Sequence, residues 1–300
     1  MTSKRSWQRV DGVLLLDKPS GMTSNSALQV ARRLFSAAKA GHTGTLDPLA
    51  TGLLPLCFGE ATKFSADLLE ADKCYEADLL FGITTDTGDA EGQIRDQRPV
   101  HFGRGDLEAV LCRFRGAIEQ IPPMYSALKR DGRPLYELAR QGLEVERAAR
   151  RVTINELTLL AFEDARCRLR VSCSKGTYVR TLAEDIGEAL NCGAHLTALR
   201  RTQVGSLNVG DALSLELLHT FSAEERLACL RPADALLQTA PALILSQEEA
   251  ARFMHGNAVR AIAASAHVGR CRVYADGRLL GVGEADAAGV LHPRRLVSTN

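Results

Sequence analysis

The chain has 300 residues, of which 45% are hydrophobic and 24% are charged, and its formal net charge is +1. This length suits one large domain or two unequal ones with a core that needs no disulfide or metal, and the net charge favours no class of partner. No stretch approaches the roughly 20 apolar residues of a membrane span, and no signal-peptide pattern occurs, so we expect a soluble, cytoplasmic protein.

The first elements are a strand and a helix joined by a turn. Residues 12–17, with the sequence Gly-Val-Leu-Leu-Leu-Asp, are mostly apolar and predict a short buried strand, which Lys18-Pro19-Ser20-Gly21 ends. The next segment has apolar residues at the spacing of one helix face, namely Ala27, Val30, Ala31 and Leu34. Thr23 or Ser24 is the expected N-cap of this helix.

A glycine-rich segment follows at residues 41–52, with the sequence Gly-His-Thr-Gly-Thr-Leu-Asp-Pro-Leu-Ala-Thr-Gly. Its glycines permit backbone angles closed to other residues, and Pro48 pushes Asp47 toward an extended conformation. The segment therefore predicts a shaped loop that holds one carboxylate, as catalytic groups are often held. Because Asp-Pro pairs also simply begin turns, the pattern by itself leaves a purely structural role open.

Regular elements and polar loops alternate in the middle of the chain. Residues 75–82 predict a strand, residues 86–92 a polar loop, and residues 106–115 a helix. The segment from 121 to 151 is rich in Arg, Lys, Tyr and Gly. It predicts an irregular basic excursion with a short helix near residues 135–140.

Residues 166–173 alternate between apolar and polar side chains, which predicts a half-exposed antiparallel strand. After residues 174–177 comes a helix whose apolar stripe is Val179, Leu182, Ala183, Ile186 and Leu190. Short helices are expected over 205–240, with a capping box at residues 222–225. The last 60 or so residues predict a small module, with a second capping box at 246–249 and strands at 271–274, 279–283 and 296–298.

The eight cysteines form no Cys-x-x-Cys pair and have no neighbouring histidine that completes a zinc pattern. We interpret them as free thiols in a reducing compartment. A His-Glu-x-x-His motif and a Walker A loop are also absent from the sequence.

Several segments carry a resemblance to a known family. They are residues 12–21, the 41–52 loop, Lys73-Cys74-Tyr75-Glu76 and Ser174-Lys175-Gly176-Thr177-Tyr178-Val179-Arg180-Thr181-Leu182. Residues 122–129 and 193–201 add further matches. In this order the segments closely resemble the TruB family of tRNA pseudouridine-55 synthases, over about residues 12–297.

The resemblance implies an α+β fold, with a largely antiparallel mixed sheet of the pseudouridine synthase type and flanking helices. The catalytic domain would span residues 10–238 and include a basic RNA-clamping insertion at about 124–151. A small β-rich, PUA-like RNA-binding domain would follow at 241–300. The implied activity is isomerisation of the uridine at position 55, in the T-arm of tRNA, to pseudouridine. It would need no cofactor, metal or obligate protein partner, and we expect a monomer.

The resemblance also implies roles for single residues. Asp47 is the nucleophile, and Arg180 is its partner, which would keep the carboxylate ionised when it is partly desolvated. Tyr75 stacks on the flipped base and is placed for proton transfer at C5. The remaining implied pocket residues are Tyr178 and Leu199, which line the uracil site, His42, which fills the gap left by the base, and Lys18 and Pro19, which support the pocket.

Basic residues cluster locally although the net charge is small. The candidates for phosphate contacts are Lys129, Arg130, Arg133, Arg147, Arg151, Arg200 and Arg201. Each cluster alone is typical of an ordinary solvated face, and only together do they indicate an RNA-binding surface.

Two other classes of function remain open. A hydrolase could pair Asp47 with a second carboxylate at Asp86 or Asp89 and would release free uracil or sugar. A tRNA-folding chaperone would bind the same RNA without catalysis, which the presence of Asp47, Tyr75 and Arg180 argues against. The sequence leaves open whether Asp47 attacks the ribose C1′ or the base C6.

Overall fold

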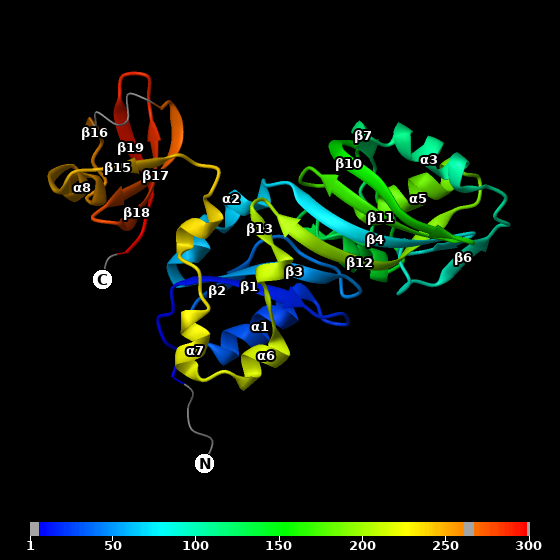
Figure 1. The fold of residues 1–300 in the computed structure, drawn as a ribbon, viewed down its shortest axis with the longest axis horizontal. Coiled ribbons are helices and arrows are strands. Elements are labelled where there is room, and N and C mark those ends of the chain that lie inside the picture. The colour runs from blue at the N-terminus through cyan, green and yellow to red at the C-terminus, as the bar shows by residue number, and fades with distance from the viewer. Residues whose placement is uncertain (1–5, 261–266, 299–300) are drawn as a thin grey trace, which may run out of the picture.

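The structure, a computed structural model, describes residues 6–260 and 267–298. One mixed sheet of ten strands forms its larger part, in the order β14-β1-β3-β12-β4-β11-β10-β7, with β2 on β3 and β13 on β12 (Figure 1). The strands are β1 (Gly12–Lys18), β2 (Ala40–His42), β3 (Thr51–Phe58), β4 (Lys73–Phe81), β7 (Gly116–Gln120), β10 (Arg150–Glu163), β11 (Arg166–Cys173), β12 (Ala194–Val204), β13 (Leu207–Asn208) and β14 (Leu213–Ser214). Two short hairpins stand apart, β5 (Ile83–Thr85) with β6 (Ile94–Gln97) and β8 (Lys129–Arg130) with β9 (Arg133–Pro134).

Most neighbouring strands in this sheet are antiparallel, and only β1–β14 and β3–β12 run parallel. This arrangement confirms the predicted α+β class with a largely antiparallel mixed sheet. The helices are α1 (Ser24–Leu34), η1 (Gly59–Phe64), α2 (Ser65–Leu69), α3 (Arg104–Arg113), α4 (Leu135–Arg140), α5 (Val179–Ala189), η2 (Val209–Asp211), α6 (Leu215–Thr220), α7 (Ala223–Ala228), η3 (Ala233–Leu236) and α8 (Gln247–Met254). None of the helices in the described residues is long and apolar enough to cross a membrane.

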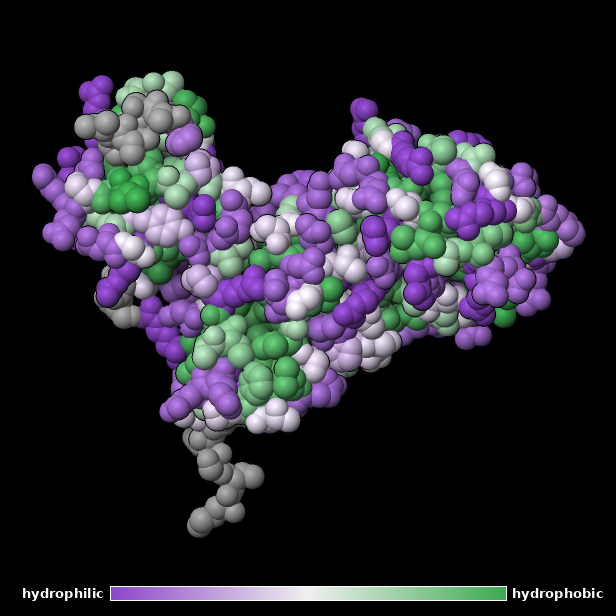
Figure 2. Space-filling model, viewed as in Figure 1, coloured by the Kyte–Doolittle hydropathy of each residue, from purple (hydrophilic) through white to green (hydrophobic). Residues whose placement is uncertain are grey.

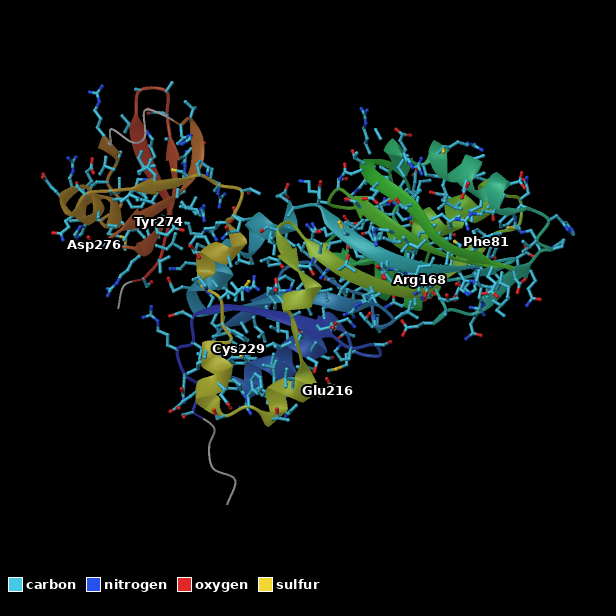
Figure 3. All side chains as sticks on the ribbon, in the orientation of Figure 1. Phe81, Arg168, Glu216, Cys229, Tyr274 and Asp276 are labelled. Atoms are coloured by element: carbon cyan, nitrogen blue, oxygen red, sulfur yellow. The ribbon has the colours of Figure 1, made fainter. Side chains whose placement is uncertain are left out.

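One face of the sheet builds the main core. The apolar side chains of β4 and β11 pack there with those of α1, α3 and α5. The other face of β4 and β11 is charged and open, and on it Arg168 forms two hydrogen bonds of 2.6 and 2.9 Å with Asp78 (Figure 3). The alternation of apolar and polar residues along β11 thus arises because one face of this strand packs in the core and the other meets solvent.

A second unit begins near Ala242. Its five strands follow the order β15-β17-β18-β19-β16, and α8 packs beside them. They are β15 (Ala242–Ile244), β16 (Val259–Arg260), β17 (Gly269–Ala275), β18 (Arg278–Ala285) and β19 (Val290–Leu296). Figure 2 shows this unit and the lobe that carries β10 and β11 rising on either side of a concave margin.

The C-terminal unit is packed against the larger one rather than tethered beside it. Val282 belongs to the same buried cluster as Val13, Leu53 and Phe64. Polar contacts surround this cluster, including an ion pair between Arg270 and Asp67 and a hydrogen bond from Lys63 Nζ to Leu296 O. The Tyr274 hydroxyl lies 2.6 Å from Asp234 Oδ2, which ties β17 to η3 (Figure 3).

Several sequence predictions agree closely with the observed elements. The helix at residues 135–140 is α4, Thr23 accepts a hydrogen bond from Ser26 N as the N-cap of α1, and both predicted capping boxes are present. The prediction of a last strand at residues 296–298 is wrong, because β19 ends at Leu296 and contains Pro293.

Three long strands, β3, β10 and β12, were not predicted from the sequence. The register of β10 shifts at residues 154–156 and 159–161, which breaks the period of two. Gly52 and Pro55 interrupt β3, and both residue types usually indicate turns rather than a strand interior.

Candidate active site

Asp47 lies on the loop between β2 and β3, and neighbouring side chains fix this loop. The buried hydroxyl of Ser24 donates to Leu46 O at 3.0 Å and accepts from Leu46 N at 2.8 Å. Lys18, also buried, donates to Pro48 O at 3.3 Å and to two more carbonyls. A Cβ added at Gly52 would lie 2.3 Å from Arg201 O, so only glycine fits where the loop joins β3. The carboxylate is therefore held on a rigid support.

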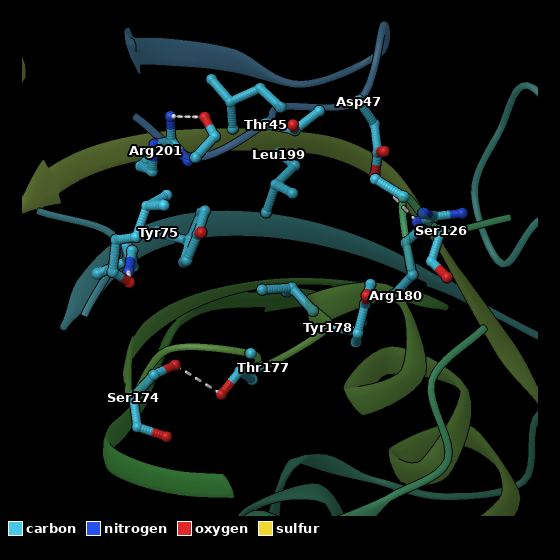
Figure 4. Close-up of a pocket in the computed structure, with 17 residues that line it drawn as sticks. Thr45, Asp47, Tyr75, Ser126, Ser174, Thr177, Tyr178, Arg180, Leu199 and Arg201 are labelled. Atoms are coloured by element: carbon cyan, nitrogen blue, oxygen red, sulfur yellow. Dashed lines mark hydrogen bonds and ion pairs between the residues drawn. The ribbon is translucent and has the colours of Figure 1, made fainter. Parts of the chain in front are cut away.

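Arg180, in the first turn of α5, is the ion-pair partner of Asp47. Arg180 Nε lies 3.0 Å from Asp47 Oδ2, and the Arg180 side chain is only 7% exposed while that of Asp47 is 40% exposed (Figure 4). The other guanidinium nitrogens donate to Thr87 O at 2.8 Å and Tyr125 O at 2.7 Å. These bonds orient the guanidinium toward the carboxylate.

A second carboxylate, Asp89, lies behind this pair. Its Oδ2 is 3.7 Å from Arg180 Nη1, its side chain is 5% exposed, and Thr87 Oγ1 donates to its Oδ1 at 2.7 Å. Asp89 is absent from the residues that line the cavity in front of Asp47. This position does not suit the two-carboxylate hydrolase, in which both acids flank the substrate.

Burial and neighbouring charges act on Asp47 in opposite directions. Desolvation raises the pKa of Asp47 above its usual value, the Arg180 guanidinium lowers it, and the charge of Asp89 raises it. The ion pair with Arg180 therefore favours the ionised form that a nucleophile needs.

Asp47 and Arg180 stand at one end of a cavity of about 270 Å³ (Figure 4). Tyr75, Tyr178 and Leu199 also line it, so the structure brings together five residues that the resemblance implied. Burial is the main cause that raises the pKa of both Tyr75 and Tyr178. An aromatic, partly apolar cavity beside a carboxylate suits a planar base.

The other implied pocket residues lie outside the cavity lining. Lys18 is fully buried beneath the Asp47 loop, and burial lowers its pKa to about 8. Pro19 stands next to it, and its carbonyl accepts a hydrogen bond from Lys18 Nζ at 2.8 Å. His42 ends β2, and its buried Nδ1 has no hydrogen-bond partner among the described residues.

The adjacent arginines of β12 occupy different environments, although the sequence analysis grouped them as solvated phosphate contacts. Arg200 is half-exposed and forms a double hydrogen bond with Asp17 at 2.7 and 3.0 Å. Arg201 is only 1% exposed and lines the cavity. The interpretation of Arg201 as a surface residue is therefore wrong, because consecutive strand residues point to opposite faces of the sheet.

Gln120 is a site residue that sequence reasoning missed. It is buried at the end of β7, where its Oε1 accepts from Tyr178 N at 3.0 Å and its Nε2 donates to Tyr178 O at 3.2 Å. The amide thereby fixes the backbone just before Arg180. No pattern in the sequence links residues 120 and 178, so only the fold reveals the contact.

The basic insertion borders the cavity through two of its residues, Ser126 and Ala127. Lys129, Arg130 and Arg133 are exposed on the hairpin β8–β9, and Arg151 is exposed on β10. Arg147 is more enclosed, with its side chain 20% exposed and 3.5 Å from Glu144. None of these five side chains lines the cavity, whereas Ser126 and Ala127 of the insertion do.

Comparisons with known proteins cover nearly the whole chain. Sequence models of the TruB family pseudouridylate synthase N-terminal domain, the tRNA pseudouridylate synthase B C-terminal domain and the pseudouridine synthase II TruB C-terminal domain match residues 32–179, 180–238 and 241–297, respectively. The "tRNA pseudouridine synthase B" of Dechloromonas aromatica is 62% identical over 297 residues, which are 99% of each chain.

The chain belongs to the TruB family of pseudouridylate synthases. The TruB family relative from Burkholderia mallei, "tRNA pseudouridine synthase B", is 60% identical over 97% of this chain and 98% of its own. Among solved structures, a chain from the crystal structure of a Cbf5-Nop10-Gar1 complex is similar, with a TM-score of 0.72 and 27% identity. That match covers 93% of this TruB family chain and 79% of the other.

Proposed function

We propose that this TruB family member isomerises the uridine at position 55 in the T-arm of tRNA to pseudouridine, with Asp47 as the nucleophile. Membership of the family and relatives about 60% identical that carry the name tRNA pseudouridine synthase B support the reaction and the tRNA substrate. The observation that carries the catalytic assignment is the 3.0 Å pair of Arg180 with Asp47 at the cavity that Tyr75 lines.

The reaction rearranges one bond without any oxidation. The N1–C1′ bond breaks with its electron pair on N1, the base turns, and a bond from C5 to C1′ forms. The proton on C5 leaves, and N1 gains one. Asp47 bonds to the nucleoside, at C1′ or at C6, and this bond breaks again so that the carboxylate is released and the product leaves. The fixed Arg180 holds Asp47 ionised and aimed for this step.

Tyr75 and Tyr178 contribute through the base. A uridine inside a folded loop must leave its stack, and an aromatic ring in the cavity replaces part of the lost stacking. We assign stacking and the proton transfer at C5 to Tyr75, and lining of the base site to Tyr178 and Leu199. Lys18 and Pro19 support the Asp47 loop, and His42 is assigned the gap left by the flipped base.

RNA binding is assigned to regions outside the cavity. The exposed cations of the insertion at residues 124–151 suit phosphates on either side of the flipped nucleotide. The C-terminal unit at 241–300 is proposed as a further RNA-binding domain. In the catalytic domain at 10–238, acidic residues outnumber basic ones by 31 to 27, so the basic character of the insertion is a local feature.

The test is an assay of purified protein on unmodified tRNA, followed by chemical mapping of pseudouridine. We expect modification at position 55 only, and none when that uridine is replaced by cytidine. Release of free uracil would indicate the hydrolase instead. Tight tRNA binding with no modified base would indicate a chaperone.

A further inference from the structure

The cavity holds two buried arginines whose charges are balanced differently. Arg180 faces the carboxylates of Asp47 and Asp89. Arg201 forms no ion pair with any acidic side chain in residues 6–260 and 267–298. Its Nε donates to Leu53 O at 2.8 Å and its Nη2 to Gly44 O at 3.2 Å, while Nη1 makes no hydrogen bond within the same residues. A buried cation without a counter-ion is costly, which points to a use for its charge.

Arg201 stands at the Tyr75 end of the cavity. Residues 201 and 75 are directly paired across the antiparallel strands β12 and β4, and both line the cavity (Figure 4). Cross-strand partners share one face of a sheet at close range. Gly44, with a φ of +76°, passes close above the guanidinium, and a Cβ there would lie 3.5 Å from Arg201 Nη1. The Gly44 backbone therefore lies in contact with the guanidinium, and Gly44 O accepts a hydrogen bond from its Nη2.

Neither RNA phosphate nor Asp47 accounts for this charge. At 1% exposure Arg201 cannot reach a phosphate at the surface, where Arg200 lies instead. Asp47 already has Arg180 at 3.0 Å. The other buried cation in the cavity lining, Lys73, donates to Leu69 O and Ala71 O. The group that faces Arg201 across the strands is the Tyr75 side chain.

We propose that Arg201 is a positioning residue for the isomerisation, which holds the Tyr75 hydroxyl in place and stabilises its phenolate while that oxygen takes the proton from C5. The inference rests on the proposed function and deepens it. Once the C5–C1′ bond has formed and the Asp47 carboxylate has been released from the nucleoside, the Tyr75 phenolate removes the C5 proton. The electron pair of the C5–H bond re-forms the C5=C6 bond, the C6=N1 pair moves to N1, and N1 takes a proton from water.

A neutral phenol is too weak a base for this step, so only the phenolate form of Tyr75 takes the proton, and an interaction that enlarges the phenolate fraction speeds the step. Burial raises the pKa of Tyr75, and Arg201 is the largest influence that lowers it. The other groups whose charge acts on Tyr75 are Cys173 on β11 and Asp47 on its loop, and the titratable side chains of Lys73, Tyr178 and Arg180 also line the cavity. Of these, Cys173 and Asp47 act against the phenolate, which leaves Arg201 as the main support from a facing strand.

The first experiment measures single-turnover rates on tRNA from pH 6 to 9 for the wild type, Arg201→Gln and Arg201→Lys. The rates of the wild type and of Arg201→Gln should both rise with pH, because the pKa of Tyr75 lies above its usual value and the phenolate is a minor species throughout this range. Arg201→Gln should be about tenfold slower at each pH, the factor that corresponds to one unit of pKa, and Arg201→Lys should recover part of the rate. Dissociation constants for tRNA should change by less than about threefold. Arg168→Gln, an arginine on the open face of the same sheet, is the matched control and should follow the wild-type profile. An Arg201→Gln rate equal to that of the wild type, a wild-type rate that does not rise with pH, or a loss confined to binding would overturn the proposal.

The second experiment does not depend on activity. With 3-fluorotyrosine at position 75, fluorine NMR should show the phenol titrating about one pH unit higher in Arg201→Gln than in the wild-type background. Arg201→Lys, which keeps the charge, serves if Arg201→Gln does not fold, and it should titrate between the two. Identical titrations in all backgrounds would refute the link to Tyr75. Absence of pseudouridine in the wild-type assay would instead refute the proposed function.

Discussion

The cavity and the basic insertion use positive charge in opposite ways. In the cavity, Arg180 and Arg201 are buried, and named oxygen atoms at 2.7–3.2 Å orient their guanidinium groups. In the insertion, Lys129, Arg130 and Arg133 are exposed, and Arg130 and Arg133 have single neutral hydrogen-bond partners. The two regions meet where Tyr125 O accepts from Arg180.

The difference follows from what each region must do. A chemical step needs groups fixed in one geometry, and a fixed charge must be buried among polar partners. Cations that bind a phosphate backbone displace the counter-ions condensed on the RNA, which favours exposed and unpaired side chains. Substitutions in the cavity should therefore change rates, and those in the insertion should change affinity and its salt dependence.

The largest effect is expected from Asp47→Asn. The amide keeps the shape of the side chain but removes the nucleophilic charge, so the single-turnover rate should fall by about 10⁴-fold or more. Affinity for tRNA should stay near that of the wild type. Asp78→Asn, on the open face of the sheet, is the control for loss of one carboxylate. Substantial multiple turnover by purified Asp47→Asn protein would contradict the assignment.

Arg180→Lys comes next. It keeps the charge but loses the planar fork that contacts Asp47, Thr87 O and Tyr125 O at once. We expect the chemical step to slow by about 100-fold, because Asp47 is then poorly oriented and less fully ionised. Rates at saturating enzyme, with binding measured in parallel, check this. If Arg180→Lys weakened tRNA binding and left the chemical step unchanged, Arg180 would act in RNA binding, as proposed for the insertion, and not in catalysis.

A double substitution of Lys129 and Arg151 by alanine tests the other region. Both side chains are exposed and outside the cavity lining, and neither has an ion pair within the described parts of the chain. The log–log salt dependence of tRNA binding should flatten by roughly two units, with the single-turnover rate at saturation unchanged. The control is a double substitution of Arg166 and Arg168 by alanine, which removes the same amount of charge from β11. It should leave the salt dependence of tRNA binding unchanged. An equal change in both double variants would mean that only net charge matters.

The smallest effect concerns Glu184, which lines a second cavity between the insertion and the loop that contains Thr87. Burial, and then the charge of Asp185, raises the pKa of Glu184 to about 7 from 4.5. Because the folded state favours the protonated carboxyl, the contribution of Glu184 to the free energy of unfolding is complete below pH 4.5. It is lost as the pH rises toward 7. Glu184→Gln removes this titration, so its Tm relative to wild type should rise between pH 5 and pH 8. Thermal melts across that range check the sign, and a constant difference would contradict it.

Local patterns in the sequence predicted local structure well. The alternation of apolar and polar residues predicted β11, and apolar residues at helical spacing predicted α1 and α5. The Ser-x-x-Glu pattern predicted the N-terminal caps of α7 and α8. The approach of Arg180 to Asp47 came from the family resemblance rather than from any pattern. Asp89, Gln120 and the burial of Arg201 depend on contacts between distant segments, which no local period encodes. The pairing of Arg201 on β12 with Tyr75 on β4 is known only from the register of the sheet.

The shared cluster of Val282 with Val13, Leu53 and Phe64 has a consequence for how the molecule unfolds. A chain cut near residue 240 would expose this apolar surface of the catalytic sheet to water. The two units should therefore melt in one cooperative transition, and calorimetry should record a single peak. Loss of activity on truncation would then report a weakened fold as much as lost RNA contacts.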